Sequence, residues 1–273
     1  MKLGTLRGRA VLIEGDLALE VGPSVREVVA DPEWSRQARP PVGSAPWFPY
    51  DAADLDAPVT DPRQVFAIAL NYAPHAAEAG YTAPDVPLVF TKWPTSVAGP
   101  VVTVPLPPGN VDWEVEVVAV VGLGGRDIDE ADAWDALAGV TGGQDLSERV
   151  LQLRGRPAQF SLGKSHAGFG PTGPWIVTPD ELEDPDDIAF ASYLDGEPLQ
   201  SGRTSQMIFS IPRLVAHLSA VVELLPGDLI FTGTPEGVGN RMEPQRFLKP
   251  GETLVSRFQG IGEITQRFVE GPS

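Results

Sequence analysis

The segment from Asp112 to Val121, which reads Asp-Trp-Glu-Val-Glu-Val-Val-Ala-Val-Val, constrains the fold more than any other part of the chain. Its β-branched residues and its alternation of polar and apolar positions predict a β-strand. Because side chains of a strand alternate between its two faces, Asp112, Glu114 and Glu116 are predicted to share one face. The opposite face would carry Trp113, Val115, Val117, Ala119 and Val121.

Two interpretations of this acidic face are open. Glu114 and Glu116 would lie about 6 to 7 Å apart at a rise of roughly 3.3 Å per residue. Like charges this close repel each other and resist desolvation, and a hard cation such as Mg²⁺ or Ca²⁺, which prefers carboxylate oxygens, would relieve both effects. The alternative is the solvated face of an edge strand. The spacing alone does not decide between a metal site and a wet edge.

Composition limits the protein class. The 273 residues suffice for one large domain, or for one domain with a small appendage, and 42% hydrophobic with 21% charged residues is typical of a globular protein. The net charge of −17 argues against nucleic acid or an anionic membrane as a partner. The chain has no cysteine, which excludes disulfides and thiolate chemistry. Without an apolar leader or a run of about 18 apolar residues, we expect a soluble, cytoplasmic protein.

The chain divides into two parts that differ in sequence pattern. Residues 1–60 contain alternating segments at 9–13 and 17–21, which predict a small antiparallel β unit, and a connector rich in Pro and Asp that includes residues 39–41 and 51–61. Further strands are predicted at 65–70, 88–90 and 229–232, and helices at 75–79 closed by Gly80, at 130–137 stopped by Gly139, and at 211–223 with Ser210 as N-cap. We therefore expect a strand-rich α+β fold with a small N-terminal β domain (1–60) and a larger domain (61–273).

His75 and Glu78 form a second candidate site. Their i, i+3 spacing on a helix places the imidazole beside the carboxylate, where Glu78 could orient His75 and raise its basicity. An exposed helix pair without a function would show the same spacing. The other two histidines are less promising, since His217 lies on the periodic helix and is expected to be structural.

Three further groups carry polar side chains in unusual surroundings. If the chain after Asp145 is helical, Asp145, Arg149 and Gln152 share one face. This face would offer a carboxylate to a cation, and a guanidinium and an amide to an anionic oxygen. The alternative is a surface ion pair between Asp145 and Arg149. Lys92 follows an apolar strand, and Lys164 stands in a mixed segment, so both are expected to face an anion. The turn at 232–239 is rich in glycine and could present N–H groups and the Thr234 hydroxyl to a carboxylate, but it matches no nucleotide-binding pattern.

Several motifs occur together in order. They are Leu70-Asn71-Tyr72-x-x-His75-x-x-Glu78, Pro87-Leu88-Val89-Phe90-Thr91-Lys92, Asp112-Trp113-Glu114-Val115-Glu116, Asp145-Leu146-Ser147-x-Arg149-x-x-Gln152, Lys164-Ser165, Gly173-Pro174-Trp175, Met207-Ile208-Phe209, and the run from Pro226-Gly227-Asp228 to Gly237-Val238-Gly239. In this order the chain, from about Val65 onward, resembles the fumarylacetoacetate hydrolase family. The resemblance is to its shorter bacterial members, the acylpyruvases and the 2-hydroxyhepta-2,4-diene-1,7-dioate isomerase-like proteins.

The resemblance implies a fold and a set of site residues. The fold would be a mixed β-sandwich roll, usually assembled as a homodimer. A divalent cation, Mg²⁺ or Mn²⁺ and sometimes Ca²⁺, would be held by Glu114, Glu116 and Asp145, while Asp112 matches no ligand position and keeps a supporting role. The family's catalytic positions match His75 and Glu78, on a lid over the substrate, and Arg149, Gln152 and Lys164 around the reacting oxygens. We assign substrate binding to Tyr72, Lys92, Gly233 and Thr234.

The reaction that the resemblance implies is hydrolysis of a C–C bond in a 2,4-dioxo acid through a metal-stabilised pyruvate enolate. The same site would serve an isomerase, a tautomerase or an oxo-acid decarboxylase, and a non-catalytic oxo-acid-binding protein is a third reading. Two positions depart from the family pattern. His166, followed by Ala167, stands where an aromatic and an acidic residue are common, and Gln206 precedes Met207. Both departures are expected to bear on the shape of the pocket, with His166 as a pocket-wall or packing residue rather than a second acid or base.

Overall fold

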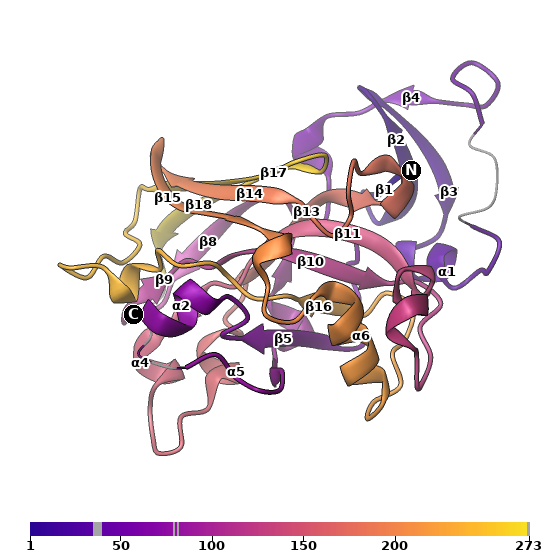
Figure 1. The fold of residues 1–273 in the computed structure, drawn as a ribbon. Helices are drawn as coiled ribbons and strands as arrows, with labels where there is room; N and C mark the ends of the chain where they lie inside the picture. The colour runs from indigo at the N-terminus through magenta and orange to yellow at the C-terminus, as the bar shows by residue number, and fades with distance from the viewer. Residues whose placement is uncertain (35–39, 79, 81, 272–273) are drawn as a thin grey trace.

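The protein has a strand-rich α+β fold with mixed sheets (Figure 1). A computed structural model describes residues 1–34, 40–78, 80 and 82–271. Within these ranges the strands form an eleven-stranded sheet, a five-stranded sheet and a two-stranded sheet. Most neighbouring strands are antiparallel, and three pairs are parallel: β16 with β5, β13 with β7, and β18 with β8.

The larger sheet runs in the order β4-β3-β2-β1-β13-β11-β10-β16-β5-β6, and β7 joins it through β13. Its strands are β1 (Lys2–Leu6), β2 (Arg9–Glu14), β3 (Leu17–Gly22), β4 (Phe48–Pro49), β5 (Val65–Ala69), β6 (Leu88–Thr91), β7 (Val97–Ala98), β10 (Val115–Val121), β11 (Leu137–Gln144), β13 (Gly170–Val177) and β16 (Leu229–Phe231).

The second sheet runs in the order β15-β14-β17-β18-β8, and β12 pairs with β9 separately. These strands are β8 (Val101–Leu106), β9 (Val111–Asp112), β12 (Ser147–Glu148), β14 (Ala189–Leu194), β15 (Glu197–Arg203), β17 (Thr253–Phe258) and β18 (Gly262–Glu270). The helices are α1 (Val25–Val29), α2 (Ala73–Glu78), α3 (Ala133–Ala136), α4 (Arg149–Gln152), α5 (Phe160–Gly163) and α6 (Ile211–Ser219). No helix in these described ranges is long and apolar enough to cross a membrane.

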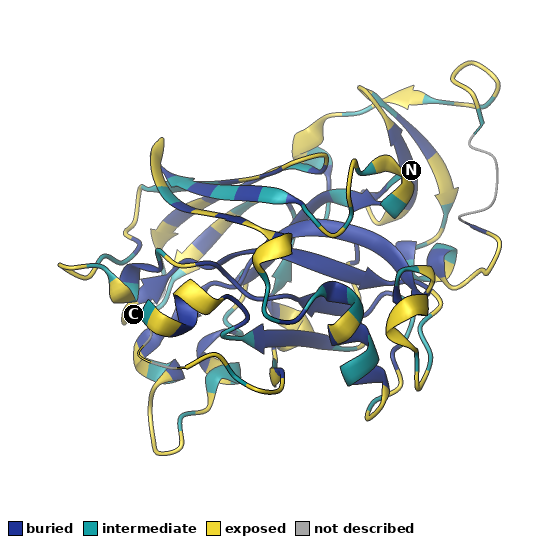
Figure 2. Cartoon of the chain, in the orientation of Figure 1, coloured by how far each residue is buried: buried dark blue, intermediate teal, exposed yellow. Residues whose placement is uncertain are grey.

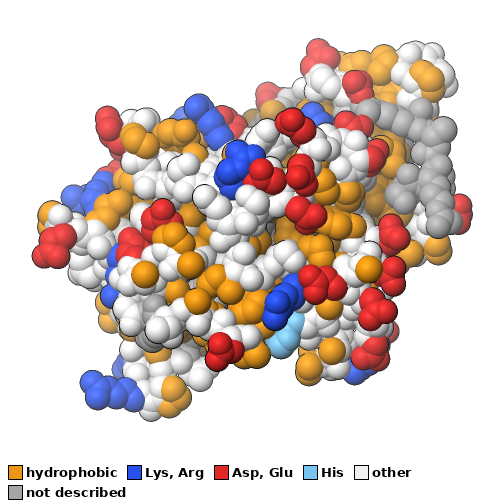
Figure 3. All heavy atoms as spheres, in the orientation of Figure 1, with side chains coloured by type: hydrophobic (Ala, Val, Ile, Leu, Met, Phe, Trp, Pro, Cys, Tyr) orange, Lys and Arg blue, Asp and Glu red, His pale blue; other side chains and the backbone are white. Residues whose placement is uncertain are grey.

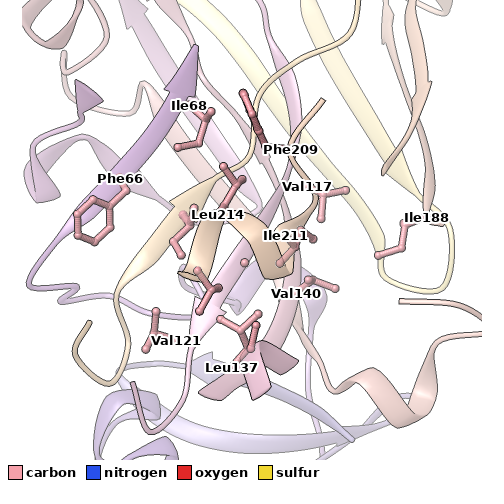
Figure 4. Close-up of a cluster of buried hydrophobic side chains, with 14 of the residues drawn as sticks. Phe66, Ile68, Val117, Val121, Leu137, Val140, Ile188, Phe209, Ile211 and Leu214 are labelled. Atoms are coloured by element: carbon pink, nitrogen blue, oxygen red, sulfur yellow. The ribbon is translucent and has the colours of Figure 1, made fainter. Parts of the chain in front are cut away.

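Strand β10 lies at the centre of the larger sheet and is buried along its whole length (Figure 2). One face of it contributes Val117 and Val121 to a core that also receives Phe209, Ile211 and Leu214 from around α6 (Figure 4). The other face of β10 packs against side chains of β1–β3 and α1. Burial on both faces explains the valine-rich sequence of this strand. The wet-edge interpretation of the acidic segment is therefore wrong.

The N-terminal strands continue the larger sheet. Strand β1 pairs with β13, with Leu3 opposite Ile176, and the hairpins β1–β2 and β2–β3 extend the sheet outward. Leu3 and Leu12 share a core with Val118 and Val120 of β10. The small antiparallel unit predicted for this region is thus joined to the central strand by hydrogen bonds and by packing. A domain boundary at residue 60 stays a prediction.

The acidic segment is not one continuous strand. Asp112 belongs to β9, which pairs with Ser147 of β12, and the longer strand resumes at Val115. Between them the N–H of Glu114 donates to the side-chain oxygen of Gln144, and that of Val115 donates to Gln200. Because side chains from β11 and β15 replace a neighbouring backbone here, the ladder is interrupted. Trp113 accordingly packs in a separate cluster with Leu146 and Phe169, and its predicted face in common with the valines of β10 is wrong.

Two predicted helices end earlier than expected. The helix at 130–137 gives way at Leu137 to β11, because Leu137 pairs with Val121 in the sheet; Gly139 serves the close approach of Val177 rather than a helix stop. The helix at 211–223 is capped by Ser210 as predicted but ends at Ser219, whose carbonyl accepts from the N–H of Asp127. Ala79 and Arg39 of the predicted segments lie outside the described residues.

Candidate metal centre and active site

Three buried carboxylates meet where β10 begins and β11 ends. One ligand atom from each of Glu114, Glu116 and Asp145 lies within 4.8 Å of the others. The backbone joins the two segments, since the N–H of Asp145 donates to the carbonyl of Glu114 at 2.8 Å, and Glu116 stands opposite Gly143 in the ladder. The structure thus brings together the three side chains that were predicted to hold a cation.

Three cations surround two of these carboxylates. The Lys164 ammonium donates to Oε2 of Glu114 and to Oδ2 of Asp145, each at 2.7 Å. Arg149 Nη1 lies 2.7 Å from Oε1 of Glu114, and Lys92 Nζ lies 2.7 Å from Oδ1 of Asp145. Burial alone would raise the pKa of Glu114, but the charges of Lys164 and Arg149 outweigh it and hold this pKa at about 2. Glu114 is therefore a carboxylate at neutral pH.

Glu116 has a different environment. Its Oε2 accepts from the Gly233 N–H at 2.8 Å, and within the described residues it forms no ion pair with a lysine or arginine. Burial, followed by the charges of Asp145 and Glu114, raises the pKa of Glu116 well above its usual value. This cluster of hard oxygen donors, one of them lacking a compensating charge, fits Mg²⁺, Mn²⁺ or Ca²⁺.

Arg149 and Gln152 lie on the single turn of α4. Arg149 donates to the Gln152 side chain at 2.9 Å and, through Nε and Nη2, to Oδ2 of Asp112 at 2.8 and 2.6 Å. Helix α4 begins only at Arg149, because residues 147–148 pair in β12. The predicted helical face shared by Asp145 and Arg149 is therefore wrong, as is the alternative of an ion pair between them: Arg149 binds Asp112 and Glu114 instead.

His75 and Glu78 form the predicted pair on α2. Nδ1 of His75 lies 3.2 Å from Oε2 of Glu78. Glu78 also accepts from the N–H of Gly237 in the glycine-rich turn, and His75 is buried close enough to Glu114 to help lower the pKa of that carboxyl. The pair is thus part of the acidic centre rather than of an exposed helix face.

A cavity of about 420 Å³ opens onto this centre and is lined by residues of α2, α4, α5, β5 and β6. Its polar wall carries His75, Glu114, Arg149, Gln152, Lys164 and Thr234. Apolar side chains of β6 and α5, including Leu88, Val89 and Phe160, form much of the remaining wall. The arrangement offers a charged end that suits an oxo acid and an apolar section that suits a carbon chain.

Not every predicted binding residue reaches this cavity. Tyr72, Lys92 and Gly233 lie behind its described lining, where Lys92 binds Asp145 and Gly233 binds Glu116. The Tyr72 hydroxyl has no hydrogen-bond partner among the residues that the structure describes, and burial followed by the charge of Glu116 raises its pKa. Thr234 does line the cavity, but its hydroxyl donates to Val115 and accepts from Gln200. Substrate binding by these four residues stays a prediction.

The two departures from the family pattern lie elsewhere. The ring of His166 packs on Phe169 with centroids 4.9 Å apart, and burial lowers its pKa. Gln206 is exposed and caps the N–H of Arg203. Neither side chain is among the described lining residues of the cavity.

Two residues that line the cavity were not predicted. Asn240 and Arg241 follow the glycine-rich turn and belong to the 3-10 turn η7 (Gly239–Arg241). The motif ends at Gly239, and nothing in the spacing of the next residues indicates a binding role. Their only signal in the sequence is that they directly follow a turn that was itself a candidate.

Comparison with known proteins agrees with this geometry. Residues 64–269 match the family described as fumarylacetoacetate (FAA) hydrolase C-terminal. A protein of Burkholderia cenocepacia named "Putative hydrolase" is 46% identical over 203 residues, which are 73% of this chain and 72% of that protein.

Solved structures are similar over the full length. A structure titled "putative HpcE protein" from Mycobacterium smegmatis has a TM-score of 0.92 and 48% identity, with 100% of both chains covered. A 5-carboxymethyl-2-hydroxymuconate delta-isomerase from the same organism has a TM-score of 0.78 and 33% identity over 100% of both chains. Maleylpyruvate hydrolase from Sphingobium sp. SYK-6, in complex with manganese(II) and pyruvate, has a TM-score of 0.82 and 26% identity, again over 100% of both. With its family match, its buried acidic triad and these neighbours, the chain belongs to the fumarylacetoacetate hydrolase family.

Proposed function

We propose that this protein hydrolyses a C–C bond in a 2,4-dioxo acid of the acylpyruvate type, with Mg²⁺ or Mn²⁺ held by Glu114, Glu116 and Asp145. The observation that carries the proposal is that Glu114 of the carboxylate cluster and His75 of the His75–Glu78 pair line the same cavity. The structure of a maleylpyruvate hydrolase with manganese(II) and pyruvate supports the choice of metal and of an oxo-acid ligand. When bound, the cation would supply Lewis-acid polarisation of the oxo-acid oxygens.

His75 is the general base in this proposal. Its Nδ1 is engaged by Glu78, which leaves Nε2 to accept a proton from water. The water oxygen then forms a bond to the C4 carbonyl carbon, and negative charge develops on the C4 oxygen. Lys164, Arg149 and Gln152 line the same cavity and are the donors available to stabilise that charge.

Cleavage of the C3–C4 bond completes the reaction. The electron pair of that bond passes to C3, which releases one carboxylic acid and the enolate of pyruvate. A proton delivered to C3 then gives pyruvate, so that one water is consumed for each bond broken. His75, which gained a proton in the first step and lines the same cavity, is the group that returns it.

The direct test is pyruvate release from a panel of 2,4-dioxo acids by the purified protein with Mg²⁺ or Mn²⁺. We expect pyruvate and the matching acid in equal amounts, and Glu116→Ala should abolish turnover. Absence of pyruvate from every member of the panel would overturn the proposal. Loss of thermal stability in Glu116→Ala with unchanged turnover would assign the metal a structural role instead.

Isomerisation is the second candidate, because a delta-isomerase is 33% identical to this chain over its full length. Retention of the carbon skeleton with a changed ultraviolet spectrum would identify it, and release of CO₂ would identify a decarboxylase. A homodimer is a further proposal from the family resemblance. Light scattering measures the molar mass of the protein in solution, and a mass near the 29.1 kDa of a single chain would contradict the dimer.

A further inference from the structure

Lys92 is a buried cation that the proposed reaction does not use. Lysine and arginine side chains lie at the surface on the face seen in Figure 3, whereas the side chain of Lys92 is fully buried. It directly follows strand β6 and is not among the described residues that line the cavity. Because a lysine is almost never enclosed unless it is paired, the contacts of its ammonium should explain its position.

The Lys92 ammonium is held by two hydrogen bonds in a closed space. Its Nζ donates to Oδ1 of Asp145 at 2.7 Å and to the backbone carbonyl of Lys164. The same Nζ lies 5.8 Å from the centroid of the Phe231 ring, and a Cβ at Gly170 would come within 3.2 Å of the lysine Cε. Packing on these sides leaves the lysine little freedom to turn away from Asp145.

The two oxygens of Asp145 are held by lysines that differ in freedom. Oδ2 accepts from Lys164, and the same ammonium donates to Oε2 of Glu114, so Oδ2 is the oxygen on the side of that neighbouring carboxylate. Lys164 lines the cavity and has room to turn into it, whereas Lys92 is enclosed. Oδ1 is thus tied to Lys92, and Oδ2 is the oxygen that Asp145 can offer to a cation.

We propose that Lys92 is a positioning residue of the metal centre, which fixes the Asp145 carboxylate so that only Oδ2 is offered to the cation. The inference rests on the proposed function for the position of the metal. Hydrogen-bonded partners of this kind orient metal ligands, and their removal typically lowers metal affinity about 10- to 100-fold.

The same contact bears on which cation binds. Ligation by a single carboxylate oxygen suits the octahedral shell of Mg²⁺ or Mn²⁺, whereas Ca²⁺ takes about six to eight oxygens and often binds both oxygens of one carboxylate. Because Lys92 withholds Oδ1 of Asp145, it favours the smaller cations over Ca²⁺.

The test measures binding of the metal alone, without substrate. Titration calorimetry with Mn²⁺ and, separately, with Ca²⁺ compares the wild type with Lys92→Met. We expect Lys92→Met to bind Mn²⁺ about 10- to 100-fold more weakly and to lose less of its affinity for Ca²⁺. The direction of the change is decisive, because removal of a positive charge that had no positioning role would raise both affinities.

A second variant disturbs the lysine and keeps its charge. Gly170→Ala places a methyl group against Cε of Lys92, so it should lower the Mn²⁺ affinity by a smaller factor. Urea unfolding without metal shows whether each variant is folded. If Lys92→Met does not fold, an unchanged Mn²⁺ affinity in Gly170→Ala overturns the inference.

Two controls separate positioning from general effects. Lys249→Met removes an exposed lysine, and Gly4→Ala adds a Cβ that meets only ordinary contacts, so both should keep the wild-type affinity for Mn²⁺. An equal or higher Mn²⁺ affinity in folded Lys92→Met, or equal losses for Mn²⁺ and Ca²⁺, would overturn the inference. Absence of Mn²⁺ binding by the wild type would overturn the proposed metal site as well, so the two failures are distinguishable.

Discussion

Asp112 carries no predicted catalytic role, yet its removal should be among the most damaging single changes in this protein. Its buried carboxylate accepts hydrogen bonds from the N–H groups of Trp113, Gly239 and Asn240 and from two nitrogens of Arg149. Replacement by alanine would leave three backbone N–H groups and two guanidinium nitrogens without their buried acceptor, although Arg149 would keep its ion pair with Glu114.

The expected cost follows from that environment. Removing one partner of a buried ion pair costs about 3–5 kcal/mol. Asp61→Ala is the matched control, because Asp61 pairs with Arg26 at the surface, where such pairs contribute about 1 kcal/mol or less. Urea unfolding of the metal-free proteins, with the slope of the transition compared between variants, measures both changes on one scale.

A double-mutant cycle then assigns the cost to the pair. Asp112→Ala, Arg149→Met and the double variant should together give a coupling energy of about 1–3 kcal/mol, because Arg149→Met removes two of the donors that Asp112→Ala leaves without an acceptor. The reasoning is wrong if Asp112→Ala costs no more than Asp61→Ala, or if the two changes at Asp112 and Arg149 are additive.

Four other expectations concern the site and the core. In metal-free protein the raised pKa of Glu116 contributes stability that is fully present below the unfolded-state pKa of 4.5 and is lost as the pH rises through the folded-state pKa. In EDTA, the free energy of unfolding of Glu116→Gln should therefore increase relative to that of the wild type as the pH rises. Parallel curves of stability against pH would refute this. Saturating Mg²⁺, at about 100 times its dissociation constant, should then stabilise the wild type by about 2.7 kcal/mol over Glu116→Gln in thermal unfolding. His75→Gln should lower the turnover number about 10²- to 10⁴-fold with oxalate affinity unchanged, and a proportional loss of both would contradict a general base. Gly142→Ala would drive a methyl group into the Phe258 ring and should cost about 1–3 kcal/mol in urea, whereas Gly4→Ala, where a Cβ meets only ordinary contacts, is the control.

The acidic strand shows what could be predicted from the chain. Alternation placed Glu114 and Glu116 on one face, and the family resemblance added Asp145 from another segment; the structure brings all three together. The interruption after Asp112 was beyond prediction, because it depends on side chains from β11 and β15 that reach the backbone only in the folded state. Local pattern and the family resemblance together predicted which carboxylates come together, but not the geometry that presents them.

The charged partners illustrate the same limit. Lys92 was expected to face an anion and does, but the anion is the protein's own Asp145. Helical spacing predicted that Arg149 lies beside Asp145, whereas in the fold Arg149 forms ion pairs with Asp112 and Glu114. Arg241 stands outside every motif, so its position on the cavity wall emerged only from the fold. Pairing among several buried charges is settled by three-dimensional proximity, which sequence spacing does not encode.

The two glutamine contacts at the start of β10 have a dynamic consequence. The N–H groups of Glu114 and Val115 are released by rotation of a side chain, while those further along β10 are released only when strands separate. Gln144 also donates to Ser256 of the second sheet, so its rotation loosens a link between the two layers. The segment that carries Glu114 can thus open as a small unit of its own, with hydrogen exchange faster than that of the sheet it belongs to.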